Sequence, residues 1–304
     1  MKRGPRQCTG ATTTLPRFDV GLAIDRKDHV EFSSDVIALD VEDHVATLWL
    51  DRPDARNALG GAFWRDLPLA AAAVAANKDV RVLVVAAKGP HFTVGLDLKE
   101  FGGHFLSGEA PSSRATANAH AYETVRVMQD SVTSLAKLAV PVIAAVHGYC
   151  IGGGIDLISA CDIRLASATA TFSVRETKVA IVADLGTLQR LPHIVSAGHV
   201  AELAFTGKDI DAQRACAIGL VNSLHGDSAD DVYAAALALA NEIAANSPLA
   251  VQGTKAVLGA NEGRTVDEGL EFVARWNTMY LASNDLREAM TAFVERRPPV
   301  FHGD

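Results

Sequence analysis

The chain has 304 residues, of which 49% are hydrophobic and 21% charged, so it is long enough to bury the core of one large globular domain. Its formal net charge of −8 and pI of about 5.7 exclude a surface built for nucleic acid or anionic membranes, because phosphate binding needs clustered Lys and Arg. The four cysteines lack metal-ligand spacing, and no apolar run reaches the ~18 residues of a spanning helix. We therefore expect no nucleic-acid partner, no membrane partner and no metal.

The first half of the chain alternates between strand and helix patterns. Residues 1–35 carry no regular pattern, and we expect a loosely ordered extension there. Two β-branched runs, 36–41 and 44–50, then predict a hairpin. Further along, helices are predicted at 62–76 and 117–138, and buried strands at 80–87 and 141–146. This alternation is typical of an α/β fold.

The second half of the chain is predicted to become helical. A helix at 155–160 and short strands at 163–166 and 171–174 complete the mixed part, so we expect an α/β core at 36–200. Only helices are predicted in the region 201–304, at 201–205, 212–218, 232–245, 249–258, 266–276 and 284–294.

Two turns containing glycine follow buried strands, at 91–98 and 147–156. A glycine run before a helix leaves backbone N–H groups free at the positive end of the helix dipole, where an anion or a developing oxyanion is stabilised. Two such groups from separate turns can form an oxyanion hole. The alternative is that the glycines only permit tight turns and close packing.

The segments 55–59, 92–98 and 147–162 resemble, in order and spacing, the signature segments of the enoyl-CoA hydratase/isomerase (crotonase) superfamily. The resemblance runs from about residue 36 to about residue 292. It implies a crotonase-like ββα spiral core with a C-terminal helical region that serves oligomerisation, giving a homotrimer or homohexamer. It also implies an acyl-CoA thioester as substrate and no cofactor, since CoA is part of the substrate.

The resemblance implies roles for residues in both glycine turns. The backbone N–H groups of Leu96 and Gly153 match the family's oxyanion hole for the thioester carbonyl. Arg56 is a candidate partner for a CoA phosphate, and its alternative is an exposed surface arginine. The positions that would bind substrate or CoA are Arg56, Ala58, Val94, Gly95, Asp97, Leu98 and Gly154.

Three carboxylates, Asp156, Glu176 and Asp184, match the family's acid/base positions. With the surrounding segments 172–176 and 182–192, they resemble the Δ3,5-Δ2,4-dienoyl-CoA isomerases, which act in fatty-acid β-oxidation. Such an isomerase moves a proton from C2 to C6, which requires two acid/base groups separated along the acyl chain. By resemblance Asp184 is the base at C2, Glu176 is the acid at C6, and Asp156 tunes their protonation or positions the chain. Clustered like charges in an apolar pocket should keep one acid protonated.

Other interpretations remain open. An enoyl-CoA hydratase would use Asp156 and Glu176 to activate water, and a non-catalytic acyl-CoA-binding protein would bind without turnover. Asp156 and Asp184 could also serve only to stabilise helix N-termini. The residues 100–115 are expected to form a loop that sets acyl length. Because residues 301–304 carry no peroxisomal address, we expect a bacterial-type cytoplasmic enzyme.

Overall fold

The computed structural model describes residues 32–106 and 113–304. The predicted extension 1–35 therefore lies almost wholly outside the described residues, and so does part of the predicted loop 100–115.

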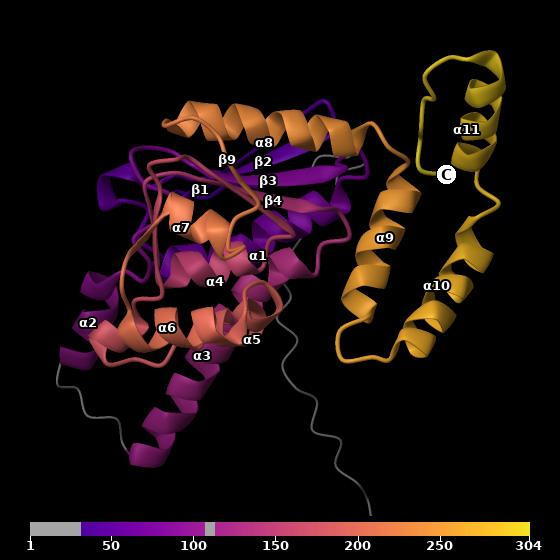
Figure 1. Cartoon of the computed structure of the whole chain (residues 1–304). Helices are drawn as coiled ribbons and strands as arrows, with labels where there is room; N and C mark the ends of the chain where they lie inside the picture. Colours follow the sequence, from indigo (N-terminus) through magenta and orange to yellow (C-terminus); the bar gives the residue numbers. More distant parts are fainter. Residues whose placement is uncertain (1–31, 107–112) are drawn as a thin grey trace, which may run out of the picture.

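A central sheet forms the middle layer of the molecule (Figure 1). In the described part of the chain it has six strands, all parallel except for the antiparallel pair β1 and β2. Every residue of β3 and β4 is buried, which explains their unbroken apolar sequences. In sheet order the strands are β1 (Ile37–Glu42), β2 (Val45–Leu50), β3 (Val82–Ala87), β4 (Val142–Val146), β6 (Ile163–Ala166) and β9 (Ser223–Leu224).

The described residues also form a second, smaller sheet. Its described strands are β5 (Tyr149–Ile151), β7 (Thr171–Ser173) and β8 (Ile210–Asp211). β5 follows β4 after only two residues, so the chain passes from one sheet to the other at the second glycine turn. The predicted site therefore lies where the two sheets meet.

Helices cover both faces of the central sheet. On one face lies α8 (Ala229–Ala244), whose buried alanines pack on β3 and β4 (Figure 1). On the other face α1 (Gly61–Ala76) packs against α3 (Arg114–Ala136), and the larger part of the apolar core lies between these helices and the sheets. α6 (Ala197–Thr206) lies beside the upper part of α3, and α7 (Ala212–Ala217) lies above α4 (Gly153–Ser159) (Figure 1).

Short helices join the larger elements. They are η1 (Pro53–Ala55), α2 (Leu98–Leu106), α4 (Gly153–Ser159), η2 (Glu176–Val179), α5 (Thr187–Arg190) and η3 (Leu191–His193). The prediction of a loop from residue 100 to residue 115 is wrong at both ends, since α2 extends to Leu106 and α3 begins at Arg114. The Asp97 carboxylate accepts hydrogen bonds from the amides of Lys99 and Glu100 and so caps α2. This cap offsets the low helix propensity of the glycines in α2.

Three further helices, α9 (Pro248–Ala260), α10 (Val266–Tyr280) and α11 (Asn284–Glu295), form an arm that extends from the core (Figure 1). The C-terminal residues fold back to the base of this arm, where Arg81 donates to the carbonyls of Ala244 and Phe301. In the described residues, no single helix has the length and apolarity to cross a membrane. α8 and α9 pass that test together, but with a bend of 106° between them.

Candidate active site

The two glycine turns lie side by side. The Thr93 amide donates to the Tyr149 carbonyl at 2.9 Å, and the Ile151 amide donates to the Thr93 carbonyl at 3.1 Å. These bonds form an isolated parallel bridge between Thr93 and Cys150. Residues more than fifty positions apart are thereby held against each other, as the resemblance implied.

The amide groups of Leu96 and Gly153 are brought close together. Gly95 has a φ of +85°, and a Cβ added there would lie 2.7 Å from the Ile151 carbonyl oxygen and 3.4 Å from the Gly153 nitrogen. A Cβ on Gly153 would lie 4.0 Å from the Leu96 nitrogen. Within the described residues neither of these two N–H groups has an acceptor. Two free backbone donors from separate turns are the kind of groups from which an oxyanion hole is built.

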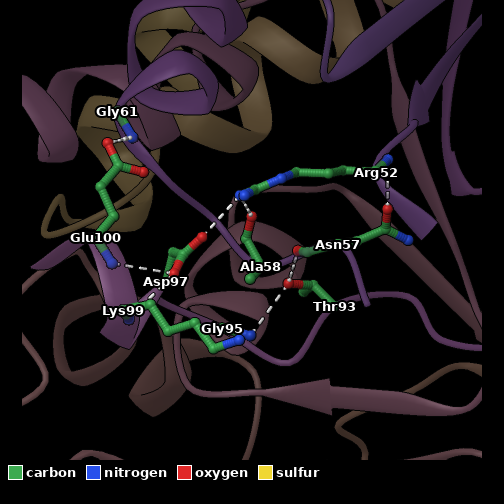
Figure 2. A network of polar contacts seen from close by, with 9 residues as sticks. All are labelled: Arg52, Asn57, Ala58, Gly61, Thr93, Gly95, Asp97, Lys99 and Glu100. Atoms are coloured by element: carbon green, nitrogen blue, oxygen red, sulfur yellow. Dashed lines mark hydrogen bonds and ion pairs between the residues drawn. The ribbon is translucent and has the colours of Figure 1, made fainter. Parts of the chain in front are cut away.

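Buried polar groups fix the first turn (Figure 2). The Thr93 hydroxyl donates to the Asn57 carbonyl at 2.6 Å and accepts from the Gly95 amide at 3.1 Å. Arg52 donates to the Asp97 carboxylate at 2.8 Å, and its own amide donates to the Asn57 side chain. Burial opposes ionisation of Asp97, but the bonds from Arg52 and from the α2 amides outweigh it and lower its pKa. The turn is therefore held before any substrate arrives.

The predicted CoA-binding positions are distributed around this turn. Arg56 is exposed, and its backbone is in the left-handed region with a φ of 52°. Its carbonyl accepts a hydrogen bond from the Val94 amide. Leu98 is 56% exposed at the start of α2, whereas Ala58 is half-buried. The remaining positions, Gly95, Asp97 and Gly154, are buried. The Asp97 carboxylate already has protein partners, so this side chain supports the turn.

Asp156 lies in the first turn of α4 and is 1% exposed. Its Oδ1 accepts from the Thr187 amide at 2.6 Å, which ties α4 to the start of α5. Burial raises the pKa of Asp156 to about 6, although the Thr187 bond and the nearby Arg190 favour the ionised form. One oxygen of this carboxylate is therefore committed to the fold.

Glu176 begins η2, and its carboxylate lies over the second glycine turn. A Cβ on Gly152 would lie 3.3 Å from Glu176 Oε1. Glu176 Oε2 is buried, and the described part of the chain offers it no hydrogen-bond partner. Burial, and to a lesser extent the carboxylates of Asp156 and Asp184, raise the pKa of Glu176 to about 7. A buried carboxyl that keeps one oxygen without a protein partner and titrates near neutrality is a candidate catalytic acid.

Asp184 lies between η2 and α5 and is half-buried. Burial raises its pKa, and its charge raises the pKa of both Asp156 and Glu176. The three predicted acids are thus close enough for the charges of Asp156 and Asp184 to raise the pKa of Glu176, and Glu176 lies against the second glycine turn. Among the described residues, no group of three His, Cys, Asp or Glu side chains is placed to hold a metal ion.

The sequence analysis missed several residues that build this site. Gln129 of α3 donates to the Asp184 carbonyl at 2.6 Å, and Arg190 donates to the Leu185 carbonyl at 3.3 Å. No local pattern identifies them, because their partners come from other elements or bind through the backbone. Arg52 was also missed, although its position three residues before Ala55 would have suggested a role in that turn.

A hollow of about 930 Å³ lies elsewhere, between the base of the arm, the C-terminal residues and the end of α1. None of the three acids lines it, so it is separate from the candidate active site.

The family model for enoyl-CoA hydratase/isomerase matches residues 40–304. The chain belongs to this family. A solved structure from Streptomyces coelicolor A3(2), a putative enoyl-CoA hydratase, is 30% identical with a TM-score of 0.82, over 95% of this chain and 100% of the other. These findings confirm the α/β class and the crotonase fold with its C-terminal helices.

Several curated relatives point to one branch of the family. A mitochondrial Δ3,5-Δ2,4-dienoyl-CoA isomerase from Dictyostelium discoideum is 42% identical over 84% of this chain and 87% of the relative. A peroxisomal one from Arabidopsis thaliana is 39% identical over 88% of this chain and 96% of the relative. The resemblance to this branch is thereby confirmed. The expectation of a cytoplasmic enzyme is wrong, because these relatives are named mitochondrial or peroxisomal and point to an organelle. The expectation was based on residues 301–304, where only a peroxisomal targeting signal was considered.

Proposed function

We propose that this protein isomerises 3,5-dienoyl-CoA to 2,4-dienoyl-CoA in fatty-acid oxidation, as the names of its relatives suggest. The observation that carries the proposal is the cluster of three acids with raised pKa values beside two free backbone amides. Such a cluster supplies a base, an acid and an electrophile within one site. The alternative of a non-catalytic acyl-CoA-binding protein gives no reason for the buried Oε2 of Glu176, which has no partner among the described residues.

The thioester oxygen of the substrate accepts from the amides of Leu96 and Gly153. Asp184 removes a proton from C2, and the electron pair spreads over the carbonyl and the two conjugated double bonds. Glu176 then gives its proton to C6, so that the C3=C4 and C5=C6 bonds become C2=C3 and C4=C5. Asp184 ends protonated and Glu176 ionised, and proton exchange with solvent restores both. Each oxyanion-hole donor is expected to contribute about 10²–10³ in rate.

The substrate's CoA group would lie along the first glycine turn. Its phosphates fit Arg56, whose exposed guanidinium has no partner among the described residues. Ala58, Val94, Gly95 and Leu98 would border the chain, and Gly154 keeps the second turn close to Thr93, since a Cβ there would lie 2.6 Å from the Thr93 methyl group. CoA is part of the substrate, so no separate cofactor is needed.

The arm supports the proposal of a homotrimer or homohexamer. Large apolar side chains on α9, α10 and α11 are exposed, which is unusual for a surface that stays in water. They include Leu258, Val266, Leu270, Met279, Met290, Phe293 and Val294. We assign oligomerisation to the arm within region 201–304, whereas β8, β9 and α8 of that region belong to the core that region 36–200 begins, because they lie in or on its sheets.

The test is the ultraviolet absorbance of the conjugated product after mixing the protein with a 3,5-dienoyl-CoA. Wild type is expected to form 2,4-dienoyl-CoA, and Asp184→Asn and Glu176→Gln are each expected to lose most of the rate. Matched controls are Asp227→Asn and Glu123→Gln, which make the same changes at exposed positions. Hydration of 2-enoyl-CoA without isomerisation would show that the isomerase assignment is wrong.

A further inference from the structure

The segment that carries Asp184 has no regular secondary structure of its own. Residues 181–186 lie between η2 and α5, and Val182 is 71% exposed. A catalytic carboxylate must nevertheless be held within about 0.5 Å of its productive position. Contacts from other elements must therefore hold this segment.

Gln129 of α3 makes the shortest of these contacts. Its Nε2 donates to the Asp184 carbonyl oxygen at 2.6 Å, and its Oε1 accepts from Arg126 Nη1 at 2.7 Å. Because a guanidinium only donates and a carbonyl only accepts, the two partners fix which end of the amide faces the segment. The side chain is thus oriented toward Asp184 from both of its ends.

A second contact holds the next peptide. Arg190 donates to the Leu185 carbonyl at 3.3 Å and to the Thr133 hydroxyl of α3 at 2.8 Å. Its guanidinium crosses directly over Gly186, which has a φ of +129° and leaves no room for a Cβ. Two consecutive carbonyls of the segment are therefore linked to α3, one by Gln129 and one through Arg190.

We propose that Gln129 is a positioning residue that sets the Asp184 carboxylate against C2 of the substrate. The inference rests on the proposed function, in which Asp184 is the base. Gln129 acts on the peptide that follows the Asp184 Cα, so it controls the direction of the side chain without touching substrate. Arg126 acts one step further out by keeping the Gln129 amide oriented.

The test is Gln129→Met, which has nearly the same length and removes the donor. The net free energy of one hydrogen bond corresponds to about a tenfold change in rate. Loss of the Gln129 bond is therefore expected to lower kcat about tenfold, while KM changes less than about twofold. Gln129→Glu keeps the shape and the Arg126 contact but turns a carboxylate oxygen toward the carbonyl, and it is expected to lose at least as much. The control is Gln189→Met, an exposed glutamine of α5 without a side-chain partner in the described residues, which should keep the wild-type kcat.

A double-mutant cycle separates positioning from general structural damage. If Gln129 acts through Asp184, Gln129→Met adds little to the residual rate of Asp184→Asn. The inference is overturned if Gln129→Met and Gln129→Glu keep the wild-type kcat while Asp184→Asn is inactive, or if Gln129→Met loses tenfold again in the Asp184→Asn background. If Asp184→Asn itself is fully active, it is the proposed function that fails.

Discussion

Replacing Glu176 by Gln should raise the stability of the protein relative to wild type, and this difference should grow as the pH rises. The same replacement should remove activity. Burial and the neighbouring carboxylates raise the pKa of Glu176 from 4.5 to about 7. In the unfolded chain the carboxyl loses its proton first, so the folded state binds more protons between these values and stability falls as the pH rises through this window. When Glu176 is fully ionised, its raised pKa lowers the free energy of unfolding by about 3.4 kcal/mol. About 0.8 kcal/mol of this loss is already present at about pH 5.

Relative to wild type, Glu176→Gln should therefore gain about 2.5 kcal/mol of stability between about pH 5 and about pH 8.5. Comparing two pH values cancels any constant cost of placing an amide at the site. Urea unfolding followed by circular dichroism at both values measures this difference. The same change at exposed Glu123 should shift stability by less than about 0.5 kcal/mol at either pH. An equal effect of Glu176→Gln at both values would refute the argument, because Glu176 would then not be a buried acid among like charges.

Three further results are expected. Because Glu176 must carry the proton delivered to C6, kcat/KM should fall as the pH rises through about 7, and a flat profile across this range would contradict the role of the acid. Gly95→Ala should lower kcat by about 10² or more, since its Cβ would lie 2.7 Å from the Ile151 carbonyl and displace the Leu96 amide; thermal unfolding of the same sample checks that it still folds. Phe293→Glu, on a side chain that is 83% exposed, should shift sedimentation toward smaller species without altering the spectrum of the folded core, and an unchanged sedimentation coefficient would remove this part of α11 from the interface.

The sequence predicted the core well because there one local signal decides the structure. β3 and β4 are continuous β-branched and apolar runs, and the structure places both in the centre of the sheet. The two-residue strands β8 and β9 were missed because only tertiary contacts create them. α2 was read as a loop from its glycines, although Asp97 followed three residues later by Glu100 is a helix-start signal.

The site shows a similar limit. Asp156, Glu176 and Asp184 were identified by their match to the family's acid/base positions, and the structure groups them. The residues that hold them were not found, because Gln129 meets Asp184 across 55 positions of the chain. A contact of one side chain with a distant carbonyl leaves no periodicity and no composition signal. Such contacts become visible only when the packing of α3 against the segment is known.

The hydrogen bond of Asp156 to Thr187 bears on the two enzymatic interpretations. A hydratase would need Asp156 and Glu176 to hold one water between them, with free oxygens on both. Here Asp156 Oδ1 already accepts from the Thr187 amide at 2.6 Å, which leaves one oxygen of Asp156 for other partners, and Glu176 Oε2 is buried without a partner in the described part of the chain. The Thr187 bond also fixes the end of the segment that carries Asp184. The charge of Asp156 raises the pKa of Glu176, and its bond to Thr187 holds the segment of the proposed base, so both effects of Asp156 are ones that proton transfer between two separated positions requires.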